Sequence, residues 1–242
     1  MTRGQNGAMT ALSGELANLA GLLADRTRAE FCLALLDGRA WTAGELASHA
    51  QVAPSTASEH LDRLISGGLL VQRRQGRHRY VELAGPRIAT LLEDLLAHLE
   101  PVPEQTRTLR AATASAALAR GRTCYDHLAG RLGVAITDAM TSAGLLDQDG
   151  GFALTDAGIA WLTSEIRVEP DGLRAGRRPL ARACLDWTER RPHLAGVAGA
   201  RICALFRDSG WTVRVGNTRA VRLTPAGDAA LRRMFDLDPA TL

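Results

Sequence analysis

The second half of the chain contains one motif order twice, and this internal repeat restricts the possible folds more than any other sequence feature. The segment Arg122–Gly130 returns, with an insertion, as Arg182–Gly196. Two further matches follow in the same order: Ala143–Leu145 with Ser209–Trp211, and Leu154–Gly158 with Leu223–Gly227. Each copy is typical of a helix ending near a glycine, a short hairpin and a helix opened by a threonine cap. The repeat predicts two related lobes, at about 120–165 and 180–236, packed about a pseudo-twofold axis.

The region before the repeat has the pattern of two short helices and a β-hairpin. Thr42 and Glu45 form a capping box that starts a helix over residues 43–50. Pro54 suits the first turn of a second helix, because a missing amide costs least there. The other predicted features are the helix-ending pair Gly67-Gly68, the strands Leu69–Gln72 and Arg79–Leu83, and the turn 74–78. Together they predict a helix-turn-helix followed by a wing.

The second helix and the hairpin carry side chains that suit nucleic acid. Five arginines and no acidic residue lie from Arg63 to Arg79. Such charge suits phosphate contact, because each neutralised phosphate releases a counterion, whereas short polar side chains read base edges. The predicted DNA-binding residues are Ser55, Thr56, Ser58, Glu59, His60, Arg63, Arg73, Arg74, Arg77, His78 and Arg79. The alternative is a solvated basic hairpin beside an ordinary surface helix.

The run Ala29–Leu83 resembles the winged-helix domain of ArsR-type bacterial transcriptional regulators. The resemblance lies above all in Glu45–Ala47, Pro54–Leu61, Gly68–Leu70 and Arg77–Tyr80. It implies a homodimer built on the first and last helices of the domain, bound to an imperfect palindrome in double-stranded DNA. It also implies repression relieved by an inducer. The half-sites of such a dimer lie about one helical turn of DNA apart, or a multiple of it.

Composition and motifs together predict two domains. The chain has 242 residues, of which 46% are apolar and 23% charged, so two compact domains are expected. Residues 1–100 should form a winged helix-turn-helix DNA-binding and dimerisation domain, 101–106 a linker, and 107–242 an effector-sensing domain that contains the repeat. The expected fold class is mainly α with small β-wings (α+β), in which the C-terminal domain consists of two winged-helix-like repeats.

Cysteine spacing and hydropathy predict a location in the cytoplasm, and the resemblance to ArsR-type regulators implies a bacterial cell and association with the nucleoid. Four widely spaced cysteines without a CxxC pair do not suggest a disulfide framework. No run approaches the roughly 18 to 20 apolar residues that a membrane span needs. We therefore expect no membrane partner.

The repeat also supplies candidate metal ligands. Cys124 and His127 are three residues apart, which would place them on one helix face, and Cys184 and His193 recur in the second copy. Two sulfurs and two imidazoles could form a tetrahedral, zinc-like site. A repeat preserves buried core residues equally well, so a core role is the alternative. The cysteines of metal-sensing relatives are absent around Glu45–His49, and a last-helix site at Glu93, Asp94, His98 and Glu100 lacks a second histidine.

An organic effector is the other possible ligand of the second domain. Its pocket would be lined by Tyr125, Trp161, Trp187, Phe206 and Trp211, with Arg122, Asp126, Arg182 and Asp186 as polar groups. The alternative is that the aromatic side chains form the core of the lobes and that the arginines pair with the aspartates.

Two rival functions remain open. A thiol-dependent enzyme could use Cys124 and His127, but a third orienting group and the common catalytic motifs are missing, so we expect no enzyme. Alternatively, the chain is a constitutive DNA-binding protein whose second domain is only structural.

Overall fold

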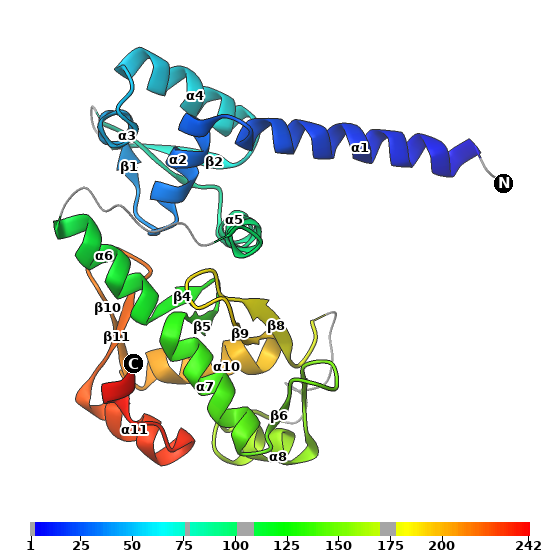
Figure 1. The fold of residues 1–242 in the computed structure, drawn as a ribbon, viewed down its shortest axis with the longest axis vertical. Helices are drawn as coiled ribbons and strands as arrows, with labels where there is room; N and C mark the ends of the chain where they lie inside the picture. Colours follow the sequence, from blue (N-terminus) through cyan, green and yellow to red (C-terminus); the bar gives the residue numbers. More distant parts are fainter. Residues whose placement is uncertain (1–2, 76–77, 101–108, 170–177) are drawn as a thin grey trace. The chain divides into compact units, whose positions relative to one another are not determined.

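The computed structural model describes residues 3–75, 78–100, 109–169 and 178–242 (Figure 1). The chain divides into two compact units, Met1–Ala89 and Thr90–Leu242. The predicted linker 101–106 lies outside the described residues. Along the described ranges, no helix combines the length and apolar character needed to cross a membrane.

The first unit is a winged helix-turn-helix, as the sequence predicts. Its helices are α1 (Arg3–Leu23), α2 (Arg26–Leu35), α3 (Ala43–Ala50) and α4 (Pro54–Ser66), and α5 (Pro86–Ala97) crosses into the second unit. Its strands are β1 (Trp41–Thr42), β2 (Leu70–Gln75) and β3 (His78–Leu83). They form an antiparallel sheet in the order β1-β3-β2, in which Leu70 pairs with Leu83. The two-residue strand β1 was not predicted.

Local chemistry accounts for the boundaries of these elements. The Thr42 hydroxyl accepts a hydrogen bond from the Glu45 amide at 3.2 Å, and the Glu45 carboxylate accepts one from the Thr42 amide at 2.7 Å. This capping box satisfies two amides that would otherwise lack partners at the start of α3. After α4 the chain turns at Gly68, whose φ of 74° favours glycine. Fully buried side chains then hold the helices to the sheet: Phe31, Leu46, Leu61, Leu64 and Val81.

The second unit contains the repeat, and each copy has the order strand, strand, helix, strand, strand, helix. Helix α6 (Leu109–Arg120) precedes the first copy. The first copy contains β4 (Arg122–Cys124), β5 (His127–Ala129), α7 (Gly130–Ser142), β6 (Leu146–Asp147), β7 (Ala153–Leu154) and α8 (Asp156–Ser164). The second contains β8 (Arg182–Leu185), β9 (Pro192–Ala195), α10 (Gly196–Asp208), β10 (Thr212–Arg214), β11 (Val221–Leu223) and α11 (Pro225–Phe235), followed by a 3-10 turn at Pro239–Thr241. The opening hairpin of each copy was not predicted.

Equivalent residues of the two copies have the same structural roles. The hydroxyls of Thr155 and Thr224 accept hydrogen bonds from the amides of Gly158 and Gly227, at 3.0 and 3.1 Å. The predicted threonine caps therefore begin α8 and α11.

The two copies are interlocked. Helix α10 packs on strand β5 of the other copy, and α7 packs on β9. Glycines permit this close approach: a Cβ at Gly199 would lie 3.2 Å from the Cβ of His127, and one at Gly133 would lie 3.5 Å from the Cβ of His193. Each hairpin is therefore fixed by the helix of the other copy.

Candidate functional site

Helix α4 presents the polar face that the sequence predicts. Pro54 occupies the first turn, and Ala57, Leu61 and Leu64 are fully buried. Ser55 is exposed at the amino end, and Thr56 and Ser58 are partly exposed beside it. Small hydroxyl side chains at an accessible helix start, where amides also lack helical partners, can contact phosphates and base edges.

His60, predicted on this face, is instead held against the start of α2. Its side chain is 15% exposed, and Nδ1 lies 3.6 Å from Asp25 Oδ1 and 3.4 Å from Arg28 Nη1. Arg28 is fixed in turn by the carbonyls of Leu22 and Gly21, to which it donates at 2.6 and 2.8 Å. The polar side chains available at the amino end of α4 are therefore the hydroxyl residues.

Acidic residues from outside the arginine run neutralise much of its charge. The ion pairs are Arg63–Glu59 at 2.7 Å, Arg73–Glu82 at 2.8 Å and Arg79–Asp62 at 2.6 Å. Arg74 is exposed and, within the described part of the chain, has no acidic partner. Arg77 and the side chain of His78 lie outside the described residues. Because exposed ion pairs contribute only about 0–1 kcal/mol, these arginines can exchange a carboxylate for a phosphate at little cost.

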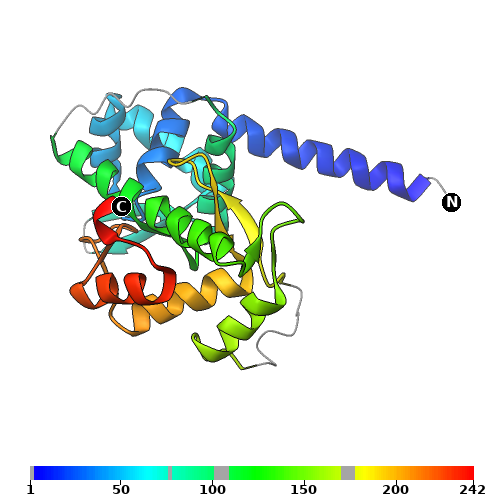
Figure 2. The ribbon, with the colours of Figure 1, turned by 60° about the horizontal axis from the view of Figure 1, so that its bottom comes forward.

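Helix α1 has an uncovered apolar stripe. Met9, Leu12 and Leu16 are 66%, 64% and 67% exposed and follow helical spacing. Both ribbon views show α1 extending beyond the other helices of its unit (Figure 1 and Figure 2). An exposed apolar stripe on a helix is typical of a surface that packs against another helix.

In the second unit, the four predicted metal ligands converge. Their ligand atoms all lie within 4.8 Å of one another, and all four residues are buried. The expectation that Cys124 and His127 share a helix face was wrong, because they lie opposite each other on β4 and β5. Cys184 and His193 form the equivalent cross-strand pair on β8 and β9. Cross-strand pairing places the cysteine and the histidine of each hairpin next to each other. The packing of β5 against β9 then brings the two cysteine–histidine pairs together.

Carboxylates lie behind both imidazoles. Asp126 Oδ1 is 3.4 Å from His127 Nδ1, and Asp186 Oδ2 is 3.3 Å from His193 Nδ1. Burial lowers the pKa of each histidine, but the neighbouring carboxylate and Cys124 outweigh it, so both pKa values are raised. Arg178 holds the Asp126 carboxylate with hydrogen bonds of 2.6 and 2.9 Å.

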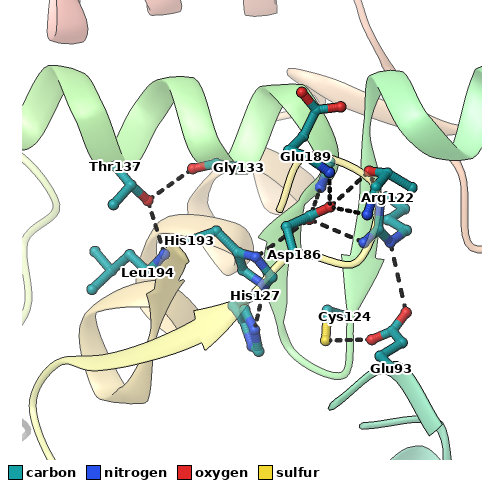
Figure 3. A network of polar contacts seen from close by, with 12 residues as sticks. Glu93, Arg122, Cys124, His127, Gly133, Thr137, Asp186, Glu189, His193 and Leu194 are labelled. Atoms are coloured by element: carbon teal, nitrogen blue, oxygen red, sulfur yellow. Dashed lines mark hydrogen bonds and ion pairs between the residues drawn. The ribbon is translucent and has the colours of Figure 1, made fainter. Parts of the chain in front are cut away.

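A buried network of charged residues surrounds this cluster (Figure 3). Arg122 donates to Asp186 Oδ2 at 3.0 Å, and its Nε lies 3.6 Å from Glu93 Oε1. Glu93, on α5, also accepts from Arg219 at 2.8 Å and from the Cys124 thiol at 2.8 Å. Burial raises the pKa of Glu93, yet Arg219 and Arg122 outweigh it and the pKa is lowered. Glu93 is thus committed to this network and is not available for the last-helix metal site considered above.

The aromatic side chains proposed for an effector pocket lie in different surroundings. Trp161, Phe206 and Trp211 belong to the apolar core, whereas Tyr125 is 57% exposed. Trp187 lies over the Arg122 guanidinium, 5.1 Å from its centre to the ring centroid. Arg122 pairs with Asp186, and Arg182 is exposed. The core alternative therefore describes Trp161, Phe206 and Trp211, whose rings pack in the apolar core, but not the exposed Tyr125.

A cavity that the sequence did not indicate lies elsewhere in this unit. It has a volume of about 930 Å³ and is lined by residues of α6, β11 and α11, including Ala117, Val221, Asp228 and Arg232. None of the predicted effector residues in the described ranges lines it.

The Cys124 thiol is poorly suited to nucleophilic catalysis. Its side chain is 1% exposed, and the hydrogen bond with Cys184, burial and the Glu93 carboxylate raise its pKa. A reactive cysteine needs a lowered pKa and access to substrate. The geometry therefore gives no support to the thiol-enzyme alternative.

Comparisons with known proteins agree with the fold. A family model described as "Helix-turn-helix domain" matches residues 23–73. The Bacillus subtilis (strain 168) protein named "Uncharacterized HTH-type transcriptional regulator YdfF" is 37% identical over 227 residues, which cover 93% of this chain and 99% of the relative. The fold and the polar helix thus define a DNA-binding protein of the winged helix-turn-helix class. The chain belongs to the family of HTH-type transcriptional regulators, and its resemblance to their ArsR-type members is confirmed.

Shorter similarities concern about a third of the chain. The HTH-type transcriptional regulator CmtR of Mycobacterium tuberculosis (H37Rv) is 40% identical over 81 residues, 34% of this chain and 68% of that protein. A solved structure titled as the cadmium metal-sensor CmtR from Mycobacterium tuberculosis shares 35% identity, covers 39% of this chain and 96% of that chain, and has a TM-score of 0.32. A homodimeric winged helix-turn-helix domain from Mycobacterium bovis, titled a possible ArsR-family regulator, shares 30% identity, covers 40% and 93%, and has a TM-score of 0.35.

Proposed function

We propose that the chain is a homodimeric transcriptional repressor that binds an imperfect palindromic operator and is released by an effector bound in the second unit. The exposed, hydroxyl-rich start of α4 beside the arginine-bearing hairpin carries this proposal. The full-length similarity to an HTH-type transcriptional regulator supports it.

The apolar stripe of α1 is the proposed dimer contact. Met9, Leu12 and Leu16 would pair with the same stripe of a second copy, because a twofold dimer joins identical patches. The resemblance to ArsR-type regulators implies the same helix for dimerisation. Two copies of α4 could then enter successive major grooves.

The proposed DNA contacts divide into two kinds. Ser55, Thr56 and Ser58 would contact base edges, since their side chains lie at the accessible amino end of α4. Arg74 would contact phosphate without first losing an acidic partner within the described residues. Arg63, Arg73 and Arg79 would add phosphate contacts by exchanging their carboxylates.

The proposed route from effector to DNA runs through α5. Glu93 lies on this helix and is bound by Arg219, Arg122 and Cys124 of the second unit. A ligand that rearranges this network changes the partners of α5, which the resemblance identifies as the last helix of the DNA-binding domain. The alternative of a constitutive DNA-binding protein predicts no such effect.

The test is selection of duplexes from a random pool by the full chain, followed by fluorescence anisotropy with the enriched sequence. We expect an inverted repeat whose half-sites are about 10 base pairs, or a multiple, apart. If the dimer contacts about 6–10 phosphates, affinity should fall about 10³- to 10⁵-fold between 50 and 200 mM salt. Absence of any enriched duplex at low salt, or affinity insensitive to salt, would contradict the proposal.

A further inference from the structure

We infer that Cys124, His127, Cys184 and His193 form one closed, four-coordinate site for a divalent cation of the zinc class. The inference concerns the second unit alone and does not depend on DNA binding.

The spacing of the four groups is close to that of a tetrahedral site. At zinc–nitrogen distances of about 2.0–2.1 Å, two imidazole ligands lie about 3.3 Å apart, and two thiolates at about 2.3 Å lie about 3.8 Å apart. The two histidine Nε2 atoms are 3.1 Å apart, and all four ligand atoms fall within 4.8 Å of one another. Small side-chain adjustments would place one ion within bonding distance of all four ligand atoms.

The carboxylates around the cluster orient the imidazoles for metal binding. Asp126 and Asp186 face the Nδ1 atoms, at 3.4 and 3.3 Å, and so favour a proton there. Each Nε2 then directs a lone pair into the cluster, and two lone pairs 3.1 Å apart repel unless a cation or a shared proton lies between them. Carboxylate–histidine–metal arrangements of this kind hold the ring and raise the basicity of the ligand.

Charge balance favours a divalent ion. A dication with two thiolates and two neutral imidazoles is neutral overall, so the buried pocket would hold no uncompensated charge. Cys124 and Cys184 are 1% and 5% exposed, and His127 and His193 are 2% and 1% exposed. Mixed sulfur and imidazole ligands select zinc or its soft congeners over magnesium or calcium, which prefer oxygen.

The repeat explains how the site arises. Each copy supplies one cysteine and one histidine from directly opposed positions of its opening hairpin. The glycines Gly133 and Gly199 permit the approach of the other copy's histidine. A bound ion would therefore join the two copies, and four protein ligands leave no open position for a substrate.

The test uses the full chain, reduced and stripped of metal, and titrated with cobalt(II) under anaerobic conditions. We expect one equivalent per chain, visible bands with the intensity of tetrahedral cobalt, a near-ultraviolet sulfur-to-cobalt band, and displacement of cobalt by zinc. Zinc should also raise the melting temperature, because a ligand that binds only the folded state stabilises it.

Paired cysteine variants identify the ligands. The double variant Cys124→Ser with Cys184→Ser should lose the sulfur-to-cobalt band, whereas Cys32→Ser with Cys203→Ser, the other two buried cysteines, should retain it. Circular dichroism establishes that each variant folds, and native mass spectrometry of the unaltered chain provides a readout without substitution. Absence of stoichiometric cobalt in the unaltered chain, octahedral spectra, or loss of the band only in the Cys32 and Cys203 variant would overturn the inference.

Discussion

At the scale of single residues, the second unit holds full charges where almost no water reaches. Arg122 is 1% exposed and Asp186 is fully buried, with 3.0 Å between Nη2 and Oδ2. Asp186 also accepts hydrogen bonds from the Gly130 amide at 2.7 Å and the Thr188 hydroxyl at 2.7 Å. Burial raises the pKa of Asp186, but His193 and Arg122 outweigh it, so the pKa is held far below its ordinary value.

We predict that Asp186→Asn lowers the free energy of unfolding by about 3–5 kcal/mol, because it removes the nearer carboxylate of the buried Arg122 and leaves only Glu93, which Arg219 shares. The matched control is Asp138→Asn, which breaks an exposed 2.7 Å pair with Arg191 and should cost about 0–1 kcal/mol. Urea denaturation of metal-free protein measures both. Equal effects of the two substitutions would contradict this account of the buried pair.

The Asp186 carboxyl also makes the free energy of unfolding depend on pH, and its contribution falls as the pH is lowered. Because the folded-state pKa of Asp186 is lowered, its contribution is fully present above the unfolded pKa of about 3.9 and is lost as the pH falls below it. The unaltered chain should therefore lose more stability than Asp186→Asn when the pH is lowered from about 5 to about 2. If the free energy of unfolding falls equally with pH for the two proteins, the lowered pKa of Asp186 is contradicted.

In the first unit, substitution of Arg74 tests phosphate binding separately from sequence recognition. We predict that Arg74→Ala weakens binding to all duplexes by a similar factor and reduces the salt slope by about 1, because one phosphate is no longer neutralised. Arg207→Ala removes an exposed arginine of α10 and should leave affinity unchanged. Anisotropy at several salt concentrations makes the comparison. If the salt dependence of affinity is unchanged in Arg74→Ala, Arg74 does not contact a phosphate.

At the scale of elements, the exposed apolar stripe of α1 is the proposed dimer contact. We predict that Leu12→Glu with Leu16→Glu produces monomers, because the substitutions place charges in the apolar stripe. Asn18→Glu, on the opposite side of the helix, is exposed and should leave the dimer intact. Sedimentation equilibrium distinguishes the two states. A dimer that survives the double substitution would assign dimerisation to another surface.

Gly199 lets α10 lie close to β9 of its own copy as well as to His127 of the other copy. A Cβ at Gly199 would lie 2.2 Å from the Leu194 carbonyl oxygen, and backbone cannot move aside easily. Gly199→Ala should therefore lower the free energy of unfolding by about 1–3 kcal/mol or more. Gly14→Ala, with open space around it in α1, should stabilise its helix by up to about 1 kcal/mol. Thermal unfolding checks both signs.

Local signals made some elements predictable and left others hidden. The Thr42–Glu45 capping box and the threonine caps of α8 and α11 depend on residues a few positions apart, so the sequence revealed them. Strands β4 and β5 have three residues each, too few for a periodic pattern, and gain their partners from distant helices. The sequence therefore grouped four residues that the structure brings together, while the helix face expected to carry Cys124 and His127 was wrong. Metal binding by the four residues stays a prediction.

The ion pairs of the arginines could not be predicted from the sequence either, because folding brings the partners together. The arginine run contains no acidic residue in sequence, yet Glu82 and Asp62 reach Arg73 and Arg79 through hairpin pairing and packing against α4. His60 is likewise held by Asp25 and Arg28, more than thirty positions away in the chain. Helical spacing placed His60 near the polar face but could not show which neighbour would cover it.

At the scale of the whole molecule, the proposed metal site is coupled to α5 through Glu93. A cation at Cys124 would displace the thiol proton, and Glu93 would lose a donor that now lies 2.8 Å away. Provided that the proposed repressor function holds, bound zinc should change operator affinity about 5- to 150-fold, and the operator should change zinc affinity by the same factor.

We predict a decrease in operator affinity when zinc binds, because Glu93 loses the hydrogen bond from the Cys124 thiol and the contacts of α5 change. Anisotropy with and without zinc measures the change, and the Cys124→Ser with Cys184→Ser protein should show none. If operator affinity is the same with and without bound zinc, the metal site is structural only. That result would contradict neither zinc binding nor operator recognition.

The position of Glu93 also determines where such regulators can be recombined. A chimera joined in the proline-containing segment 101–106 would carry α5 with one parent and the partners of Glu93 with the other, leaving a buried anion facing foreign residues. A junction at Ala89–Thr90, where the second compact unit begins, keeps Glu93 together with Arg122, Cys124 and Arg219. Second units exchanged at that junction should transfer as intact modules.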